Sequence, residues 1–322
     1  MVAADVERFT ERVRRGEVFE SDRDRRPFTD LRPVKSPVDA EIAEVLLSAP
    51  SEPEARAALS GLHDRAHADR AQRRRRMHDH AIGLSHERGK SVAALAQGRR
   101  RAAEALVKLP PGFGRPQYIL LTEPYLIWPT GITLQSSGIA QGDSFAKFEI
   151  IVDPDSSSYG AVRFLYYWTN PYDDEQALIN IDVLCTWNGL NDVTVDGGLF
   201  VSDRNISSVA AWLDVNPLWD PNLIVGGDYW SIFGEYLDDN TLGYSPPQEV
   251  ATQVHSGSDL RAQNLLVPPL RTVVFSARVS VDCQVDGAGL GVFDYASGSF
   301  QVGSPYALVT VLARYPQIGP RA

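Results

Sequence analysis

Cysteine is scarce in this sequence: the chain has 322 residues and only two cysteines, Cys185 and Cys283. Two cysteines cannot form the set of disulfides that stabilises many small secreted domains. Each lies in the apolar phase of an alternating run, as in Ile181, Val183, Cys185. Free cysteines are usually buried and behave as small apolar residues. We therefore expect two reduced cysteines in a β core, and a single bridge between neighbouring strands stays open as the alternative.

Long apolar runs are missing. No segment approaches the roughly 20 apolar residues that a membrane-spanning helix needs. The first residues, MVAADVERFTERVRR, contain acidic side chains and no apolar run, which fits neither a signal peptide nor a transit peptide. We expect synthesis in the cytoplasm and no membrane partner, and export by a non-classical route stays open.

Aromatic residues are nearly absent from the first third of the chain. All six tryptophans and all twelve tyrosines lie after residue 108, and only Phe9, Phe19 and Phe28 precede it. Charge divides at the same place, with a net charge of +4 over residues 1–108 and −14 over the remainder. A large core is therefore expected only in the last two thirds, whose acidic surface should repel nucleic acid and anionic membranes.

Helical patterns dominate the region before residue 110. Residues 1–53 predict a leader with short helices, because Val6, Phe9 and Val13 are spaced by three and four. Residues 54–109 contain no proline and are rich in helix formers. This composition predicts a long polar helix or a helical hairpin broken near Gly83–Gly89. Its apolar stripe is thin, which favours pairing with another helix in a coiled coil over burial in a globule.

After the turn-rich stretch LPPGFGRP the periodicity changes from helical to alternating. Residues 110–322 contain eight or more runs of β-branched and aromatic residues, separated by turn signals such as TNPYDD and LDDNTLG. This pattern predicts an antiparallel β-sandwich that is jelly-roll-like, with a short helix at 207–213 between strands. The predicted fold class is α+β as segregated parts, with an N-terminal extended helical arm followed by the sandwich.

The most highly charged stretch is HDRAHADRAQRRRRMHDH, residues 63–80. Four consecutive arginines on a helix point to every side of it, and no aromatic residue lies between them to stack on bases. The preferred interpretation is a basic arm that binds an acidic surface of another copy or of another protein, and nucleic-acid association is the alternative. The basic arm comprises Arg73, Arg74, Arg75, Arg76, Arg99, Arg100 and Arg101.

No metal site can be assigned from the sequence. His63 and His67 share one helical face, but no HExxH motif includes them. The stretch DPDSSS has the alternating oxygens of a calcium loop, yet Ser158 stands where that loop needs glycine and Phe164 where it needs an acid. We expect no cofactor, and calcium between loops of the sandwich stays open.

Catalytic motifs are also missing. His255 is the only histidine after residue 110, and no nucleophile elbow, CxxC, phosphate loop or dinucleotide fingerprint is present. We assign no catalytic residue and expect a protein that is not an enzyme.

Aromatic residues near turns of the sandwich are the remaining binding candidates, because exposed rings can stack on sugars or act as protein hot spots. The candidates are Tyr167, Trp168, Tyr172, Trp212 and Trp219.

The sequence therefore favours an assembly or binding protein that self-associates or docks through its helical arm and presents a binding surface on its sandwich. The layout resembles that of capsid-type and fibre-type assembly proteins, a resemblance of layout and not of motifs. One alternative is a carbohydrate-binding or carbohydrate-active sandwich, for which calcium dependence stays open. The other is nucleic-acid association through the arginine-rich helix.

Overall fold

The computed structural model describes residues 2–14, 44, 48, 54, 90, 92–108, 116–152, 156–195, 199–220, 226–244, 248–287 and 295–316. Helix α1 spans Val2–Arg14, and an unlabelled second helix spans residues 92–107. Three short strands come first, then eight longer ones: β1 Gln117–Leu121, β2 Leu126–Thr130, β3 Leu134–Gly138, β4 Phe145–Val152, β5 Ser156–Thr169, β6 Glu175–Val195, β7 Leu199–Pro217, β8 Gly226–Tyr244, β9 Gln248–Val267, β10 Thr272–Gly287 and β11 Tyr295–Pro316.

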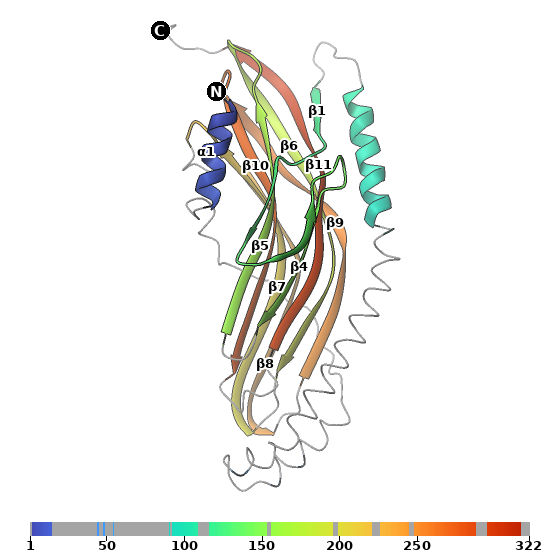
Figure 1. Ribbon diagram of the computed structural model, residues 1–322, viewed down its shortest axis with the longest axis vertical. Helices are drawn as coiled ribbons and strands as arrows, with labels where there is room; N and C mark the ends of the chain where they lie inside the picture. The colour runs from blue at the N-terminus through green and yellow to red at the C-terminus, as the bar shows by residue number, and fades with distance from the viewer. Residues whose placement is uncertain are drawn as a thin grey trace.

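The strands form two antiparallel sheets packed face to face (Figure 1). Sheet A has the order β3-β4-β11-β6-β9, with β1 also paired to β11, and sheet B has the order β2-β5-β10-β7-β8. The eight longer strands pair in a nested way: β4 with β11, β5 with β10, β6 with β9 and β7 with β8. Successive pairs alternate between the sheets, so the predicted antiparallel β-sandwich is confirmed.

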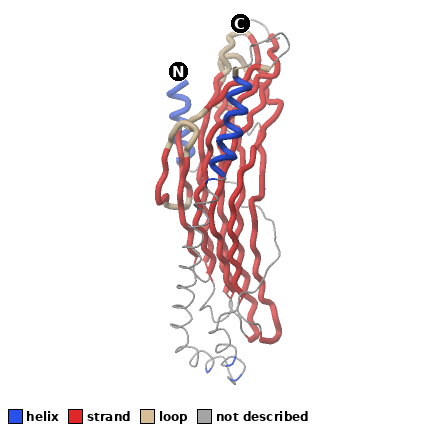
Figure 2. Tube along the Cα trace, turned by 90° about the vertical axis from the view of Figure 1, so that its right-hand side faces the viewer, coloured by secondary structure: helices blue, strands red, loops and turns tan. Residues whose placement is uncertain are grey.

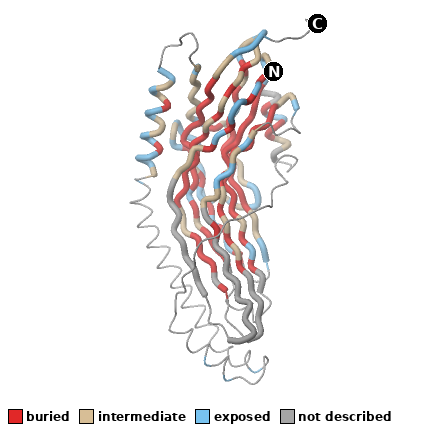
Figure 3. The backbone as a smooth tube through the Cα atoms, turned by 180° about the vertical axis from the view of Figure 1, so that it is seen from behind, coloured by how far each residue is buried: buried red, intermediate tan, exposed pale blue. Residues whose placement is uncertain are grey.

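Side chains that point inward and outward alternate along each strand, and this alternation explains how the two sheets pack on each other. In β5, Phe164 and Tyr166 point to the other sheet, while Arg163 and Leu165 point outward. Buried residues follow the described part of the strands in both sheets (Figure 3). One continuous apolar layer between the sheets therefore holds the fold together.

Each sheet carries a helix on its outer face (Figures 1 and 2). Phe9 of α1 is 2% exposed and packs on Leu165 and Val274 of sheet B, and Thr10 lies 3.2 Å from the hydroxyl of Tyr125. The helix at 92–107 packs on sheet A. Apolar residues on these outer faces are thus covered by helices from the first third of the chain.

The expected extended arm is only partly present. Among the described residues of that region, 54, 90 and 92–107 are helical, and the continuous helix at 92–107 lies along a sheet instead of pairing with another helix. The coiled coil is therefore not supported. No helix among the described residues is both long and apolar enough to cross a membrane.

The short helix predicted at 207–213 is wrong, because these residues belong to β7. Val209, Ala211 and Leu213 point into the core, a period of two that a helix cannot satisfy. The alanines suggested a helix, but pairing with β8 and β10 on both sides decides the conformation.

Both cysteines are free and fully buried, as expected. Burial raises the pKa of Cys185 to about 12, so the reactive thiolate is a minor species at neutral pH.

Neither thiol should react with a thiol-specific reagent in the folded protein. At pH 8, a pKa of about 12 leaves about one Cys185 side chain in ten thousand as thiolate, and burial blocks access. Titration with Ellman's reagent should find no fast-reacting thiol in buffer and two in denaturant. A fast thiol in buffer would contradict the buried positions of Cys185 and Cys283.

Removing one hydroxyl from the core should be costly. The Tyr166 hydroxyl donates to the carbonyl oxygen of Ser304 at 2.8 Å and lies 3.0 Å from its Oγ, and Tyr166 is 1% exposed. Tyr166→Phe leaves these buried groups without a partner and should lower the free energy of unfolding by about 1–3 kcal/mol. Tyr167→Phe is the matched control: the ring is 42% exposed, so denaturant unfolding should shift by less than about 0.5 kcal/mol.

Candidate functional site

The helix at 92–107 is fixed to sheet A by apolar contacts. Ala96 and Ala103 are 9% and 4% exposed and pack on Leu184, Tyr306 and Leu308. Small residues on the helix allow it to approach the strands closely, while the tyrosine and leucine side chains of the sheet fill the space between. This surface of the helix is thus occupied by its own chain.

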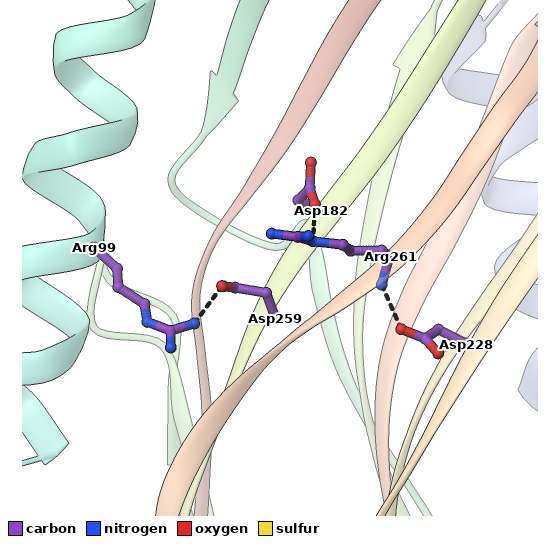
Figure 4. A network of polar contacts seen from close by, with 5 residues as sticks. All are labelled: Arg99, Asp182, Asp228, Asp259 and Arg261. Atoms are coloured by element: carbon purple, nitrogen blue, oxygen red, sulfur yellow. Dashed lines mark hydrogen bonds and ion pairs between the residues drawn. The ribbon is translucent and has the colours of Figure 1, made fainter.

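Charged groups reinforce the docking. Arg99 forms an ion pair with Asp259 of β9, and Arg261 lies 2.8 Å from Asp182 of β6 (Figure 4). The backbone amide of Arg261 donates to Oδ2 of Asp228 at 2.8 Å, so a carboxylate of β8 satisfies an amide of the edge strand β9. Burial raises the pKa of Asp182, with Arg261 acting in the opposite direction.

Two of the three described arginines of the predicted basic arm are engaged within the chain. Besides Arg99, Arg100 donates to the carbonyl oxygen of Gln141 at 3.0 Å and to Glu104 at 2.9 Å. A β-carbon at Gly142 would collide with the Arg100 guanidinium, so glycine permits this approach. Arg101 is exposed, and Arg73, Arg74, Arg75 and Arg76 lie outside the described residues.

A second polar arrangement crosses the outer face of sheet B. The register places five side chains in one row over five strands. In spatial order the row is Trp128, Arg163, Arg278, Trp212 and Tyr229.

Contacts within this row are specific. The Arg278 guanidinium lies 4.8 Å from the centre of the Trp212 ring, a cation–π distance. Trp212 donates from Nε1 to Ser280 Oγ at 3.0 Å, and its ring centre lies 4.2 Å from that of Tyr229. The Trp212 ring therefore lies between Arg278 and Tyr229, and its indole nitrogen is bound to Ser280. These contacts fix the ring against which Tyr229 packs.

The arginines of the row are buried on the outer face of the sheet. Arg163 and Arg278 are cross-strand neighbours that are 3% and 2% exposed. Burial, and secondly the charge of Arg278, lowers the pKa of Arg163 to about 10, while Asp214 raises it. Asp214 Oδ2 lies 3.2 Å from Arg278 Nε. The Arg163 guanidinium thus stays charged at neutral pH, and both buried arginine side chains are rigid parts of the sheet.

The row ends at solvent on edge strand β8. Tyr229 is 37% exposed, and the next residue, Trp230, is 53% exposed. Successive side chains of a strand point to opposite faces, so Tyr229 lies on the outer face beside Trp212, and Trp230, which is paired with the core-facing Ala211, lies on the inner face at the edge of the sheet. We call these two exposed rings, which flank the edge strand, the β8 aromatic strip. Exposed aromatic side chains can stack on sugars or act as hot spots for another protein.

The predicted aromatic candidates do not form one surface. Trp168 is 6% exposed and belongs to the core, so its prediction as a surface candidate is wrong. It lies two residues after Tyr166 in β5 and therefore points to the same, inner side of the sheet. Trp219 packs partly buried against the core. Tyr167 is exposed and contacts the Tyr125 ring at 5.5 Å, whereas Tyr172 lies at one end of the sandwich under Arg314.

The strip itself was missed, because Asp228, Tyr229 and Trp230 read as part of an ordinary strand. Arginine at the centre of apolar runs, as at Arg163 and Arg278, was a signal that could have identified the row.

Among the described residues no three or more His, Cys, Asp and Glu side chains are grouped so that they could hold a metal ion. Residues 153–155 of the calcium-like stretch lie outside the described residues. The buried hydroxyl of Ser207 donates to Asn191 Oδ1 at 2.7 Å and lies 3.2 Å from the Cys283 sulfur, deep between the sheets where no substrate reaches it.

Comparisons with known proteins give only distant similarities. No protein-family model matches the sequence, and no curated protein matches it. Among solved structures, the chain is similar to the carbohydrate-binding module TmCBM61 in complex with β-1,4-galactotriose, with 10% identity over 58% of this chain and 90% of that one and a TM-score of 0.20. Lectin UEA-II complexed with galactose has 10% identity over 60% and 98% of the two chains and a TM-score of 0.21. A CocE/NonD family hydrolase from Staphylococcus aureus has 10% identity over 61% and 36%, also with a TM-score of 0.21. Such values identify no ligand for this chain.

A charge placed under the 92–107 helix should destabilise its docking. Ala103→Glu would bury a carboxylate against Leu184 and Leu308 and should cost about 2–4 kcal/mol. Ala102→Glu is the control, since Ala102 is exposed on the same helix and should change stability by less than about 0.5 kcal/mol. The backbone amides of the 92–107 helix should exchange hydrogen faster in Ala103→Glu than in the wild type, and at the wild-type rate in Ala102→Glu. Equal protection from exchange in both variants would contradict the docking.

Proposed function

We propose that this protein is a binding module without catalytic activity and that its β-sandwich binds carbohydrate at the β8 aromatic strip. The observation that carries the proposal is the exposure of Tyr229 and Trp230, at 37% and 53%, on an edge strand whose neighbour Trp212 is held by Arg278. A ring that is exposed and already fixed loses little conformational entropy when a sugar stacks on it.

Polar groups beside the strip suit a sugar with many hydroxyl groups. Asp228 precedes Tyr229 in β8, and the Arg261 side chain is 59% exposed close to it, since its backbone amide binds Asp228. A carboxylate and a guanidinium next to aromatic rings can accept and donate hydrogen bonds to neighbouring hydroxyls.

Docking through the basic arm is the second candidate. It loses support because Arg99 and Arg100 are engaged within the chain. The same engagement weakens nucleic-acid association, which needs arginines free to neutralise phosphates.

For the fold we propose a jelly roll. Its support is the nested pairing of β4 to β11, in which one long hairpin is rolled so that successive strand pairs fall in alternate sheets. Jelly rolls occur in lectin and capsid domains alike, so the topology is compatible with binding and with assembly.

Removing the exposed rings should abolish carbohydrate binding. A glycan array followed by isothermal titration, with β-1,4-galactotriose and galactose as the first probes, should detect a ligand for the full chain. Tyr229→Ala and Trp230→Ala should each weaken binding at least about tenfold, or about 1.4 kcal/mol. Tyr167→Ala, which removes an exposed ring on β5, should leave binding unchanged.

Each binding experiment should be run with calcium and with a chelator, which tests the calcium expectation directly. No bound glycan under either condition, or equal loss in all three variants, would contradict the proposal.

A further inference from the structure

Two loops at one end of the sandwich are joined by a buried side chain and by backbone hydrogen bonds beside it. Asn170 follows β5 and is 0% exposed. Its amide donates to the carbonyl oxygens of Glu175, Val267 and Pro268 at 2.9, 3.0 and 3.1 Å, and its Oδ1 accepts from the amide of Tyr172 at 3.2 Å. The β5–β6 and β9–β10 connections therefore form one rigid surface.

Leu270 lies at the tip of this surface in an unfavourable backbone conformation. Its φ is 56°, in the left-handed region that glycine and asparagine adopt far more readily than leucine. The turn is closed by the Arg271 amide, which donates to the Pro268 carbonyl oxygen at 3.2 Å, and by the Leu270 amide, which donates to Tyr172 O at 3.1 Å. The Leu270 side chain is 60% exposed. Neither the backbone nor the core thus requires leucine here.

Other apolar side chains lie close to this tip on the outer face of sheet A. Leu266 of β9 is 51% exposed and pairs with Leu178 of β6, which pairs in turn with Ala313 of β11; Tyr315, two residues further, is 50% exposed. We call Leu178, Leu266, Leu270 and Tyr315 the loop-end patch.

The loop-end patch continues a surface that this chain already covers by docking. On the same face of β6 and β11, Leu184 and Leu308 are buried under the 92–107 helix. The uncovered end has the same leucine and tyrosine composition, which indicates a protein surface as its partner.

Charges of both signs border the patch. Asp173 and Asp174 are exposed on one of its loops and Arg271 on the other. A twofold axis that passes midway between the two loops would bring the acidic loop of one copy opposite Arg271 of the other, because a twofold interface repeats each contact in both directions. This charge pattern is self-complementary.

We propose that the loop-end patch is a homodimer interface, with a second copy of this chain as its partner and Leu270 as the central contact. The proposed role of Leu270 rests on its exposure, at 60%, in a left-handed backbone conformation that leucine seldom adopts. The loop-end patch shares no residue with the β8 aromatic strip, so the dimer can be tested without a carbohydrate ligand.

Leu270→Asn separates association from folding. Asparagine relieves the left-handed strain, so at a protein concentration low enough for both proteins to be monomeric the variant should unfold at an equal or higher denaturant concentration than the wild type, while its dimer dissociation constant rises at least about tenfold. Sedimentation equilibrium of the full chain measures the association. Ile139→Asn is the matched control: Ile139 is 47% exposed in a loop outside the patch and its replacement should leave the dimer intact.

A second pair of variants tests the strand part of the patch. Leu266→Ser should weaken the dimer, and Ile151→Ser, at a residue 52% exposed on β4, should not. A wild-type chain that stays monomeric up to about 100 µM, a Leu270→Asn variant that still dimerises, or one that unfolds more easily would each overturn the proposal.

Discussion

The structure depends on one layer of apolar side chains between two sheets. Strands β4 to β7 and β9 to β11 contribute alternating residues to this layer, and nested pairing brings strands from distant parts of the sequence, such as β4 and β11, into register. A shift of one residue in any strand would turn its apolar side chains outward. The buried side chains of Phe148, Ile181 and Phe275 thus fix the register that positions everything on the outer faces.

Because the core uses one side of each sheet, the outer sides are available for other contacts. Part of each is covered by helix, with Phe9 on sheet B and Ala103 on sheet A. The basic first third therefore serves the acidic sandwich of its own chain, and Arg99 with Asp259 is a direct instance. Among the described residues that stay uncovered, the β8 aromatic strip and the loop-end patch are the two surfaces to which we assign binding.

Several features could be predicted from local pattern alone. Alternation identified the strands and placed Cys185 and Cys283 inside, because every second residue of a half-buried strand faces the core. The same rule should have placed Trp168 inside with Phe164 and Tyr166, and counting positions along β5 would have removed it from the surface candidates. The 207–213 segment failed for another reason: its alanines favour a helix locally, but pairing with strands on both sides outweighs that preference.

The sequence by itself determined where the core would be, since all but three of the aromatic residues lie after residue 108, and burial of apolar area drives folding wherever they occur. The tertiary structure alone decided which side chains reach solvent and which meet. Trp230 is exposed because β8 is an edge strand, Arg278 meets Trp212 because β7 pairs with β10, and Leu270 is strained because two distant loops are joined by Asn170. Such contacts join residues far apart in the chain, and no local pattern encodes which distant strand a residue will face.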